Sequence, residues 1–394
     1  MEYKYDLCIV GGLGHVGLPL SITFADKGLK VCAYDTSKET YDIVSSGKMP
    51  FIEYGAEEVL GRVLRDGSLT VSMSPETLSE SKNIIITIGT PTDIHLSPEP
   101  AVEHMIEEYS KYFVDDQLII LRSTVHPGTT ERVDRILKSK GRKLHVAFCP
   151  ERIAQGYAMT ELLEMPHIVS STSQEGEERA SELFRKLNKE ILVMKPTEAE
   201  LVKLFTNAYR YINFGIANQF YMIATDAGCE FQRIYDVMTY NYPRMKNFAK
   251  PGFASGPCLL KDTVHLSAYS SHNFQLGNSA IMVNEGMPSY IVSKLKQKYD
   301  IKEKKIAILG MAFKANIDDK RDSLSYKLLK LLKYDAKEVL CTDPYINDKT
   351  FVPLEKAVNE ADIIILGVPH KEYKDLKLGK SKIIIDIWNF LSKA

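Results

Sequence analysis

The stretch Asp6-Leu7-Cys8-Ile9-Val10-Gly11-Gly12-Leu13-Gly14-His15-Val16-Gly17 passes from a short apolar run straight into a glycine-rich turn. The apolar run predicts a buried strand, and residues 18–27 predict a helix that opens at the turn. A second predicted strand, residues 30–34, ends in Asp35, which lies 18 residues after the last glycine. The pattern G-x-G-x-x-G alone is a weak signal, but the surrounding strands, helix and acid make it specific.

This arrangement is typical of a dinucleotide site. The glycines permit a tight turn and let a pyrophosphate reach the backbone at the start of the helix. Asp35 can accept hydrogen bonds from a ribose 2′-hydroxyl, and its charge would repel a 2′-phosphate. We therefore predict NAD rather than NADP, against the plainer alternative of a tight turn without a ligand. The predicted contacts in this stretch are Gly12, Leu13, Gly14, His15, Val16, Gly17 and Asp35.

Three further apolar runs, residues 83–88, 117–122 and 144–148, continue the α/β alternation. They are followed by Gly89-Thr90-Pro91-Thr92, Ser123-Thr124 and Cys149-Pro150-Glu151-Arg152. Parallel strands present their carboxyl ends at one edge of a sheet, where ligands bind. We expect Thr90, Pro91 and Thr124 to line the cofactor site, although a loop hydroxyl can simply be a helix cap.

A long helix is predicted over residues 197–227, between Pro196 and Gly228. It opens with the capping box T-x-x-E and carries an apolar stripe at helical spacing. Such a helix can join two domains and pack a second stripe against a partner subunit. On one face stand Lys203, Asn207 and Arg210, and the plain alternative for such residues is a solvated polar surface.

The segment Pro251–Asp262 sets one cysteine in a loop punctuated by glycine and proline. If a helix begins near Cys258, its free N–H groups and dipole favour a thiolate. Asp262 then lies one turn away on the same face. The pair is a candidate nucleophile with an acid/base neighbour, and the alternative is a buried cysteine beside a helix start.

A second α/β unit is predicted from residue 304 onward, with strands at 305–309, 338–342, 363–368 and 382–387. Its first loop has no G-x-G-x-x-G and instead offers cations that suit phosphate; the alternative is a salt-bridged surface loop. The predicted architecture is thus α/β, with two doubly wound Rossmann-like domains joined by the long helix and a helical middle domain. The predicted boundaries are 1–195, 196–300 and 301–394.

Composition narrows the class of protein. Of 394 residues, 44% are hydrophobic and 26% charged, as in soluble globular proteins. A net charge of −1 gives no electrostatic footprint for nucleic acid or an anionic membrane. No apolar run approaches the ~20 residues that span a bilayer. The six cysteines have no C-x-x-C spacing, so we expect no metal, reduced thiols and a cytoplasmic protein.

In this order, the motifs resemble those of the nucleotide-sugar dehydrogenases, which are NAD-dependent enzymes that oxidise the C6 alcohol of a UDP-sugar to a carboxylate. The resemblance covers essentially the whole chain. It rests on Gly12–Gly17 with Leu18-Pro19, Gly89–Thr92, Ser123–Thr130, Cys149–Arg152, Lys203 with Asn207, Gly256-Pro257-Cys258 with Lys261-Asp262, and Phe313–Asn316 with Arg321-Asp322-Ser323.

The resemblance implies a catalytic set of Cys258, Lys203, Asn207, Asp262, Glu151 and Thr124. Cys258 would capture the aldehyde between the two hydride transfers as a thiohemiacetal, which then becomes a thioester. Lys203 and Asn207 would stabilise the developing oxyanion, and Asp262 would serve in proton transfer. Glu151 would activate the hydrolytic water, while Thr124 would orient the reacting group or its water.

The resemblance also implies substrate contacts. Lys314 and Arg321 would bind the UDP phosphates, and Arg244 would reach the sugar. The full implied set is Arg152, Lys203, Asn207, Arg210, Arg244, Phe253, Gly256, Phe313, Lys314 and Arg321. A homodimer formed through the long helix and a role in bacterial surface polysaccharide precursors are also expected.

The sugar is less sharply indicated. Cys149-Pro150-Glu151-Arg152 looks like the N-acetylhexosamine enzymes, whereas Lys261-Asp262 looks like the UDP-glucose type. Trp388 stands where the family usually has an arginine. We favour UDP-N-acetylglucosamine or UDP-N-acetylmannosamine. UDP-glucose 6-dehydrogenase, a two-electron β-hydroxyacid dehydrogenase and a non-catalytic nucleotide-binding protein stay open as alternatives.

Overall fold

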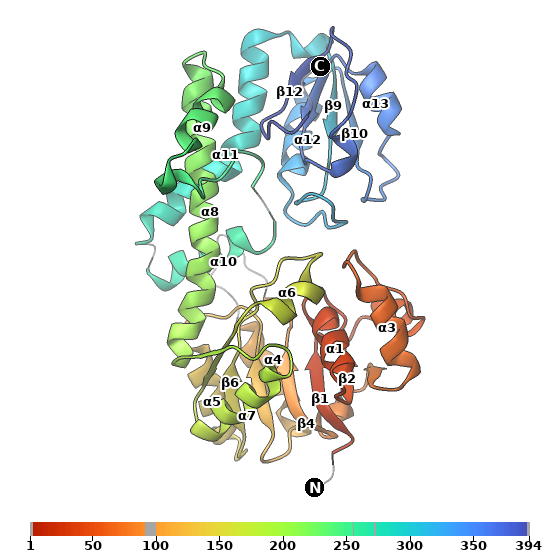
Figure 1. Cartoon of the computed structure of the whole chain (residues 1–394), viewed down its shortest axis with the longest axis vertical. Helices are drawn as coiled ribbons and strands as arrows, with labels where there is room; N and C mark the ends of the chain where they lie inside the picture. The colour runs from red at the N-terminus through yellow and green to blue at the C-terminus, as the bar shows by residue number, and fades with distance from the viewer. Residues whose placement is uncertain (1–2, 91–99, 255, 272, 392–394) are drawn as a thin grey trace. The chain divides into compact units, whose positions relative to one another are not determined.

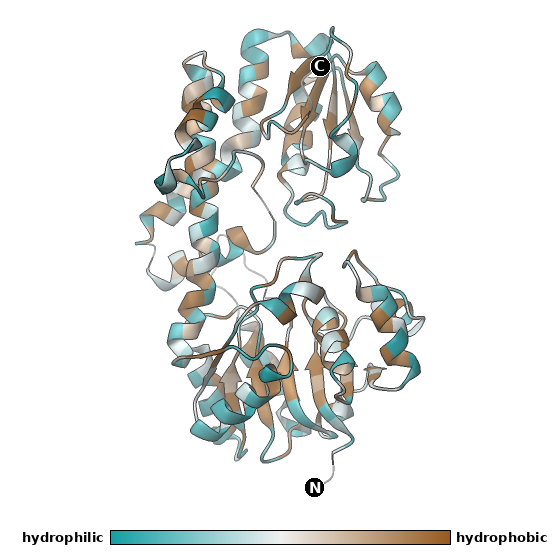
Figure 2. Ribbon diagram, viewed as in Figure 1, coloured by the Kyte–Doolittle hydropathy of each residue, from teal (hydrophilic) through white to brown (hydrophobic). Residues whose placement is uncertain are grey.

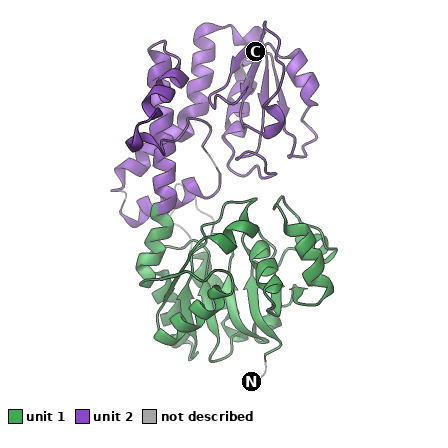
Figure 3. Ribbon diagram, in the orientation of Figure 1, with its two compact units in different colours: residues 1–205 green, residues 206–394 purple. Residues whose placement is uncertain are grey.

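The computed structural model describes residues 3–90, 100–254, 256–271 and 273–391. The chain divides into two compact units, residues 1–205 and 206–394 (Figure 3). The division falls within the long helix α8, Pro196–Asp226, which confirms the helix predicted over 197–227. The units are described separately below, and the three-domain division remains a prediction.

Unit 1 is built on an eight-stranded sheet of order β3-β2-β1-β4-β5-β6-β7-β8, parallel except where β7 meets β6 (Figure 1). Its strands are β1 Tyr5–Val10, β2 Val31–Tyr34, β3 Leu69–Ser72, β4 Ser81–Ile86, β5 Leu118–Leu121, β6 His145–Phe148, β7 His167–Ser171 and β8 Ile191–Val193. Its helices before α8 are α1 Gly17–Asp26, α2 Lys38–Ser45, α3 Ala56–Arg65, α4 Ala101–Tyr109, α5 Thr129–Ser139, α6 Ala158–Glu164 and α7 Gln174–Arg185.

Both faces of this sheet are covered by helices. Along β1, Leu7 and Ile9 pack on the side of α1, α3 and α7, while Cys8 and Val10 pack on the side of α4 and α5. Burial on two faces explains why these strands are continuous apolar runs rather than alternating ones (Figure 2).

Unit 2 contains a four-stranded parallel sheet of order β10-β9-β11-β12. Its strands are β9 Lys305–Leu309, β10 Glu338–Thr342, β11 Ile363–Leu366 and β12 Ile383–Ile385. Its helices after α8 are α9 Phe231–Thr239, α10 Leu259–Tyr269, α11 Gln275–Lys298, α12 Leu324–Asp335 and α13 Leu354–Glu360. The order matches that of β2-β1-β4-β5 in the first sheet, so the predicted pair of Rossmann-like folds is confirmed.

Helices α8 and α11 pack closely in unit 2. A Cβ atom added to Gly215 would lie 3.1 Å from the Cβ of Ala280. The buried amides of Asn218 and Asn284 are joined at 2.8 Å, and Asn284 also donates to the carbonyl of Tyr211. This paired amide fixes the register of the two helices. In the part of the chain that the structure describes, no helix is both long and apolar enough to cross a membrane.

Candidate active site

The glycine loop after β1 is shaped by close backbone packing. A Cβ atom on Gly12 would lie 2.6 Å from the carbonyl oxygen of Ile9, and one on Gly17 would lie 2.1 Å from that of Gly11. Neither position therefore accepts a side chain. Val16 caps α1 without a side-chain hydrogen bond within the described structure, and no acid stands in the first turn. These features leave the start of the helix suited to a pyrophosphate.

Asp35 is held beside this loop at the end of β2. Its Oδ2 accepts a hydrogen bond from the backbone of Leu13 at 3.1 Å, and its Oδ1 accepts one from Ser37 at 3.1 Å. Asp35 as a residue remains partly exposed. The loop and the acid thus form the cradle that NAD requires, and they would hold its pyrophosphate and adenosine ribose.

We expect Asp35→Ala to weaken NAD binding about tenfold or more, because a charged acceptor for the ribose is lost. Affinity for NADP should fall less or rise, because the repulsion of a 2′-phosphate is removed. Calorimetric titration with both cofactors measures this. Asp66→Ala is a suitable control. Asp66 also accepts a backbone hydrogen bond, but it directly follows α3 and lies away from the glycine loop. Unchanged NAD affinity in Asp35→Ala would contradict the ribose contact.

Of the other predicted cofactor contacts, Thr90 and Thr124 lie in the segments that follow β4 and β5, and His15 lies in the glycine loop. Thr90 is buried and Thr124 is half-buried, while Pro91 lies outside the described residues. Ser123 donates its hydroxyl to the carbonyl of Ile88 at 2.7 Å, which ties the loop after β5 to that after β4. The imidazole of His15 stacks on Phe51 with ring centroids 4.1 Å apart.

Glu151 is buried and tightly held. Its Oε1 accepts backbone hydrogen bonds from Arg152 at 2.6 Å and Ile153 at 2.8 Å, and its Oε2 pairs with the guanidinium of Arg122. Burial alone would raise the pKa of Glu151. The charge of Arg122, these N–H groups and the nearby Lys203 outweigh burial and hold that pKa below its ordinary value.

Arg122 is a functional candidate that the sequence prediction missed. Its side chain is 1% exposed, it donates to the carbonyl of Cys149 at 3.0 Å, and its guanidinium lies over the ring of Phe184. Burial and the charge of Arg122 lower the pKa of His167 to about 4, so this neighbouring imidazole is neutral. The available signal was a cation at the end of an otherwise apolar strand, directly before Ser123-Thr124.

Cys258 is exposed and caps the N-terminus of α10, as the loop sequence predicted. Asp262, one turn into this helix, is 0% exposed. The amide of Asn207 donates to its Oδ2 at 2.6 Å, whereas Oδ1 has no hydrogen-bond partner among the described residues. The structure thus brings together two predicted catalytic residues and leaves one buried carboxylate oxygen available. Lys203 lies one turn earlier than Asn207 on α8.

The cysteine loop packs against aromatic rings from the segments that follow β9 and β12. A Cβ atom on Gly252 would lie 2.3 Å from Trp388, and one on Gly256, whose φ is +109°, would lie 2.5 Å from Phe313. The indole N–H of Trp388 donates to Gly367 at 3.1 Å. Glycine is therefore required at both ends of the loop. Trp388, which stands where an arginine was expected, packs on the segment that leads to Cys258.

The predicted substrate residues fall in different environments. Arg321 forms a forked pair with Asp319, and this hydrogen bonding, with a smaller contribution from Cys258, raises the pKa of Arg321. Phe253 is 2% exposed and lies in the core of unit 2, so the predicted contact with substrate would be made by its backbone. Lys314 is half-buried, whereas Arg210 and Arg244 are exposed.

Arg152 and Arg244 each have a local partner. The guanidinium of Arg152 donates to the carbonyl of Pro166. The guanidinium of Arg244 lies over the ring of Tyr242 and donates to its hydroxyl at 3.3 Å. Their roles in substrate binding remain predictions.

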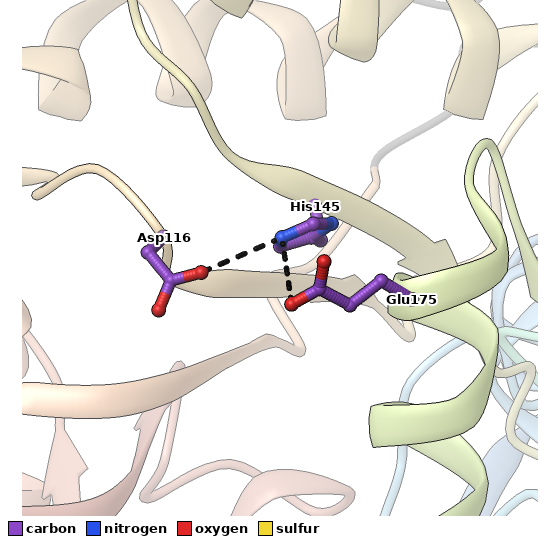
Figure 4. A group of neighbouring side chains, drawn as sticks. All are labelled: Asp116, His145 and Glu175. Carbon is purple, nitrogen blue, oxygen red and sulfur yellow. Dashed lines mark ion pairs between the residues drawn. The ribbon is translucent and has the colours of Figure 1, made fainter.

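One group of potential metal ligands occurs among the described residues: Asp116, His145 and Glu175 (Figure 4). His145 lies 3.6 Å from Asp116 and 3.5 Å from Glu175. Arg179 also pairs with both carboxylates, at 3.4 and 3.8 Å, so its guanidinium already balances part of their negative charge. The group stands at the amino ends of β5 and β6, away from the glycine loop, and is a surface ion-pair network.

Comparison with known proteins agrees with this geometry. Residues 6–188 match the NAD binding domain of the UDP-glucose/GDP-mannose dehydrogenase family, residues 197–286 its central domain and residues 307–393 its UDP binding domain. The chain belongs to this family. The predicted nucleotide-sugar dehydrogenase class, NAD cofactor and oxidoreductase activity are confirmed, which removes the β-hydroxyacid and non-catalytic alternatives.

Similar proteins include enzymes with different named substrates. UDP-N-acetyl-D-mannosamine dehydrogenase from Pyrococcus horikoshii is 34% identical over 97% of this chain and 95% of its own. Its namesake from Methanocaldococcus jannaschii is 31% identical over 98% and 93%. A solved UDP-D-ManNAc dehydrogenase from P. horikoshii superposes with a TM-score of 0.91 at 32% identity, covering 98% and 96% of the chains. A UDP-glucose dehydrogenase from Pyrobaculum islandicum gives 0.88 at 25% identity, covering 98% of both.

Proposed function

We propose that this chain is a UDP-N-acetylhexosamine 6-dehydrogenase with UDP-N-acetyl-D-mannosamine as its favoured substrate. The observation that carries the reaction type is Cys258 at the N-terminus of α10, one turn from the buried pair of Asp262 and Asn207. The sugar is supported by full-length relatives named for UDP-N-acetyl-D-mannosamine. The second candidate is UDP-glucose, because an enzyme of that name shares the fold at a TM-score of 0.88.

The proposed residues divide the work of a four-electron oxidation. Bound NAD⁺ accepts one hydride at a time, so the acid product requires two cofactors in turn. Asp262, with its open Oδ1, would take the proton of the C6 hydroxyl through a bound water, and Asn207 holds the other oxygen in place. The ammonium of Lys203 would stabilise negative charge on the sugar oxygen.

Cys258 would then form a bond to C6 of the aldehyde, giving a thiohemiacetal. Loss of the second hydride from this carbon, and of the hydroxyl proton to the water held by Asp262, leaves a thioester, and water cleaves it to the carboxylate and the free thiol. Glu151, held ionised by Arg122, would orient that water and accept its proton. Thr124, at the end of the neighbouring strand, would fix the water or the reacting group.

The ratio of NADH formed to UDP-sugar consumed tests the proposal. We expect two NADH per sugar, with UDP-N-acetylmannosamine preferred over UDP-N-acetylglucosamine, UDP-N-acetylgalactosamine and UDP-glucose. One NADH per sugar would mean that the reaction stops at the carbonyl and that Cys258 has another role. Preference for UDP-glucose would transfer the assignment to the second candidate.

A homodimer through α8 is the proposed assembly. Large apolar side chains remain exposed at helical spacing along α8 and on neighbouring helices. They include Phe205, Tyr209, Ile216, Phe220, Ile223, Val237, Leu276 and Met282. Light scattering should give twice the chain mass. Ile223→Glu should reduce the measured mass, whereas Val193→Glu, at a similarly exposed site in β8, should not. A wild-type monomer would contradict the proposal.

The cytoplasmic location and the supply of bacterial surface polysaccharide precursors, both expected from the sequence, stay predictions.

A further inference from the structure

The two sheets place an acid at the same point. Asp35 directly follows β2, and Asp343 directly follows β10, which holds the same place in its sheet. Each carboxylate accepts backbone hydrogen bonds from the loop after the adjacent central strand. Asp35 accepts from Leu13 at 3.1 Å, and Asp343 accepts from Met311 at 2.6 Å and Ala312 at 3.0 Å.

The two acids differ in what surrounds them. Both residues are partly exposed as a whole, but the side chain of Asp343 is 0% exposed and makes more hydrogen bonds. Oδ1 of Asp343 accepts from the backbones of Tyr345 at 2.8 Å and Ile346 at 3.0 Å, and its Oδ2 also meets His370. A carboxylate enclosed in this way cannot reach the hydroxyls of a ribose, which is the task of the acid in a dinucleotide site.

His370 connects Asp343 to the loop after β9. Its side chain is 0% exposed, its Nε2 lies 3.1 Å from Oδ2 of Asp343, and its Nδ1 lies 2.9 Å from the backbone nitrogen of Asn316. Because the N–H of Asn316 must donate, Nδ1 is the acceptor and Nε2 carries the proton towards the carboxylate. Burial alone would raise the pKa of Asp343, but His370 and the backbone donors hold it low, as expected for an ionised acceptor.

The loop end that His370 holds is conformationally unusual. Asn316 has a φ of +61°, and its Oδ1 accepts a hydrogen bond from the backbone of Lys371 at 3.0 Å. Residues 310–316, which we term the nucleotide loop, are thus tied at one end to Asp343 and at the other to His370 and Lys371. The loop carries Phe313, which packs on Gly256, and the half-buried Lys314.

We propose that His370 and Asp343 are positioning residues that set the nucleotide loop in shape for a nucleoside diphosphate. The inference rests on the proposed function, because the ligand of this loop is taken to be the UDP part of the substrate. The acid at this position would contact a ribose in the first sheet, whereas in the second sheet it fixes the loop. Because the backbone of the loop is already fixed, Lys314 would be held in position to contact the diphosphate.

The test compares two variants of His370 with a surface control. His370→Leu removes both hydrogen bonds, and His370→Gln retains a donor and an acceptor on one side chain. His145→Gln is the control, in a histidine of the surface ion-pair network in unit 1. UDP and NAD⁺ are titrated separately by calorimetry, and kcat and KM for the UDP-sugar are measured at saturating NAD⁺.

We expect His370→Leu to raise the Kd of UDP and the KM of the UDP-sugar about tenfold. The Kd of NAD⁺ and kcat at saturation should stay within about twofold, as expected when only substrate binding changes. His370→Gln should recover part of the loss, and His145→Gln should match the wild type. UDP affinity in His370→Leu within twofold of the wild type would overturn the inference, and so would equal losses in UDP and NAD⁺ affinity.

A measurement on the unaltered protein covers the case in which the variants do not fold. Nitrogen NMR of ¹⁵N-histidine-labelled protein, with the ring signals of His370 assigned through its backbone, should show this imidazole neutral and protonated at Nε2, with its Nδ1 hydrogen-bonded. Protonation of the His370 ring at Nδ1 instead would overturn the inference. Absence of UDP binding by the wild type would overturn the proposed function and this inference together, whereas binding that His370→Leu leaves intact would overturn the inference alone.

Discussion

Cys258→Ser should lower the rate of NADH formation by about 10³-fold or more while NAD and UDP-sugar still bind. A serine hydroxyl is far less nucleophilic than a thiolate at neutral pH, so the aldehyde would no longer be captured efficiently. Cys258 is exposed and caps the N-terminus of α10 without a side-chain hydrogen bond in the described chain, so its thiol is accessible to substrate. Serine would offer only a hydroxyl there.

The measurement combines steady-state assays with calorimetric binding of the UDP-sugar. Rapid mixing will show whether a first hydride transfer or a trapped intermediate survives in Cys258→Ser. Cys229→Ser is the matched control, because Cys229 is the other exposed free cysteine among the described residues and lies between α8 and α9. Normal turnover in Cys258→Ser would remove this residue from the mechanism.

Local patterns were sufficient to predict the strands and the main loops. The core strands of both sheets are buried on two faces, so each is a continuous apolar run that stands out in the sequence. The parallel order then places the loop ends at one edge. For this reason Asp35, Glu151 and the residues after β9 could be selected as site candidates before their surroundings were known.

What the sequence could not supply were contacts between distant residues. Arg122 and Glu151 are 29 residues apart, and Asp343 and His370 are 27 apart. Nothing in either local pattern distinguishes a buried ion pair from two surface charges. The antiparallel pairing of β7 with β6 also depends on the path of the chain between them, which local periodicity does not encode.

The packing of Trp388 on Gly252 illustrates the same limit. In the sequence, Trp388 was a departure from the family pattern, and Gly252 was one of two glycines in a loop. The structure joins them, because only a glycine leaves room for the indole. The glycine therefore meets a packing requirement from a residue more than a hundred positions away, in addition to any conformational one.

The second large effect is expected for Arg122→Met, which removes the cation that Glu151 faces. The two side chains are 1% and 9% exposed, so the carboxylate would be left buried and unpaired. Breaking a buried pair from one side typically costs about 3–5 kcal/mol. We expect a loss of this size in the free energy of unfolding, measured by urea denaturation at neutral pH. Arg132→Met is the control, because Arg132 pairs with Glu103 while 41% exposed and should cost less than about 1 kcal/mol.

The free energy of unfolding should also change with pH in opposite directions in the wild type and in Arg122→Met, as far as Glu151 contributes to it. In the wild type the pKa of Glu151 is depressed, so its ionised form adds stability that is present above the unfolded-state pKa and is lost as pH falls through the native one. In Arg122→Met, burial becomes the dominant influence and should raise that pKa. The variant should then lose stability as pH rises through the acidic range, opposite to the wild-type contribution of this group.

The double variant Arg122→Met/Glu151→Gln separates charge from packing. An uncharged amide does not carry the cost of a buried unpaired carboxylate, so the double variant should be more stable than Arg122→Met at neutral pH and should lose the altered pH dependence. It should not regain activity, since Glu151 is the proposed base for thioester hydrolysis. If the double variant is no more stable than Arg122→Met, the loss comes from the packing of Arg122 on Phe184, and the ionised state of Glu151 does not depend on this pair.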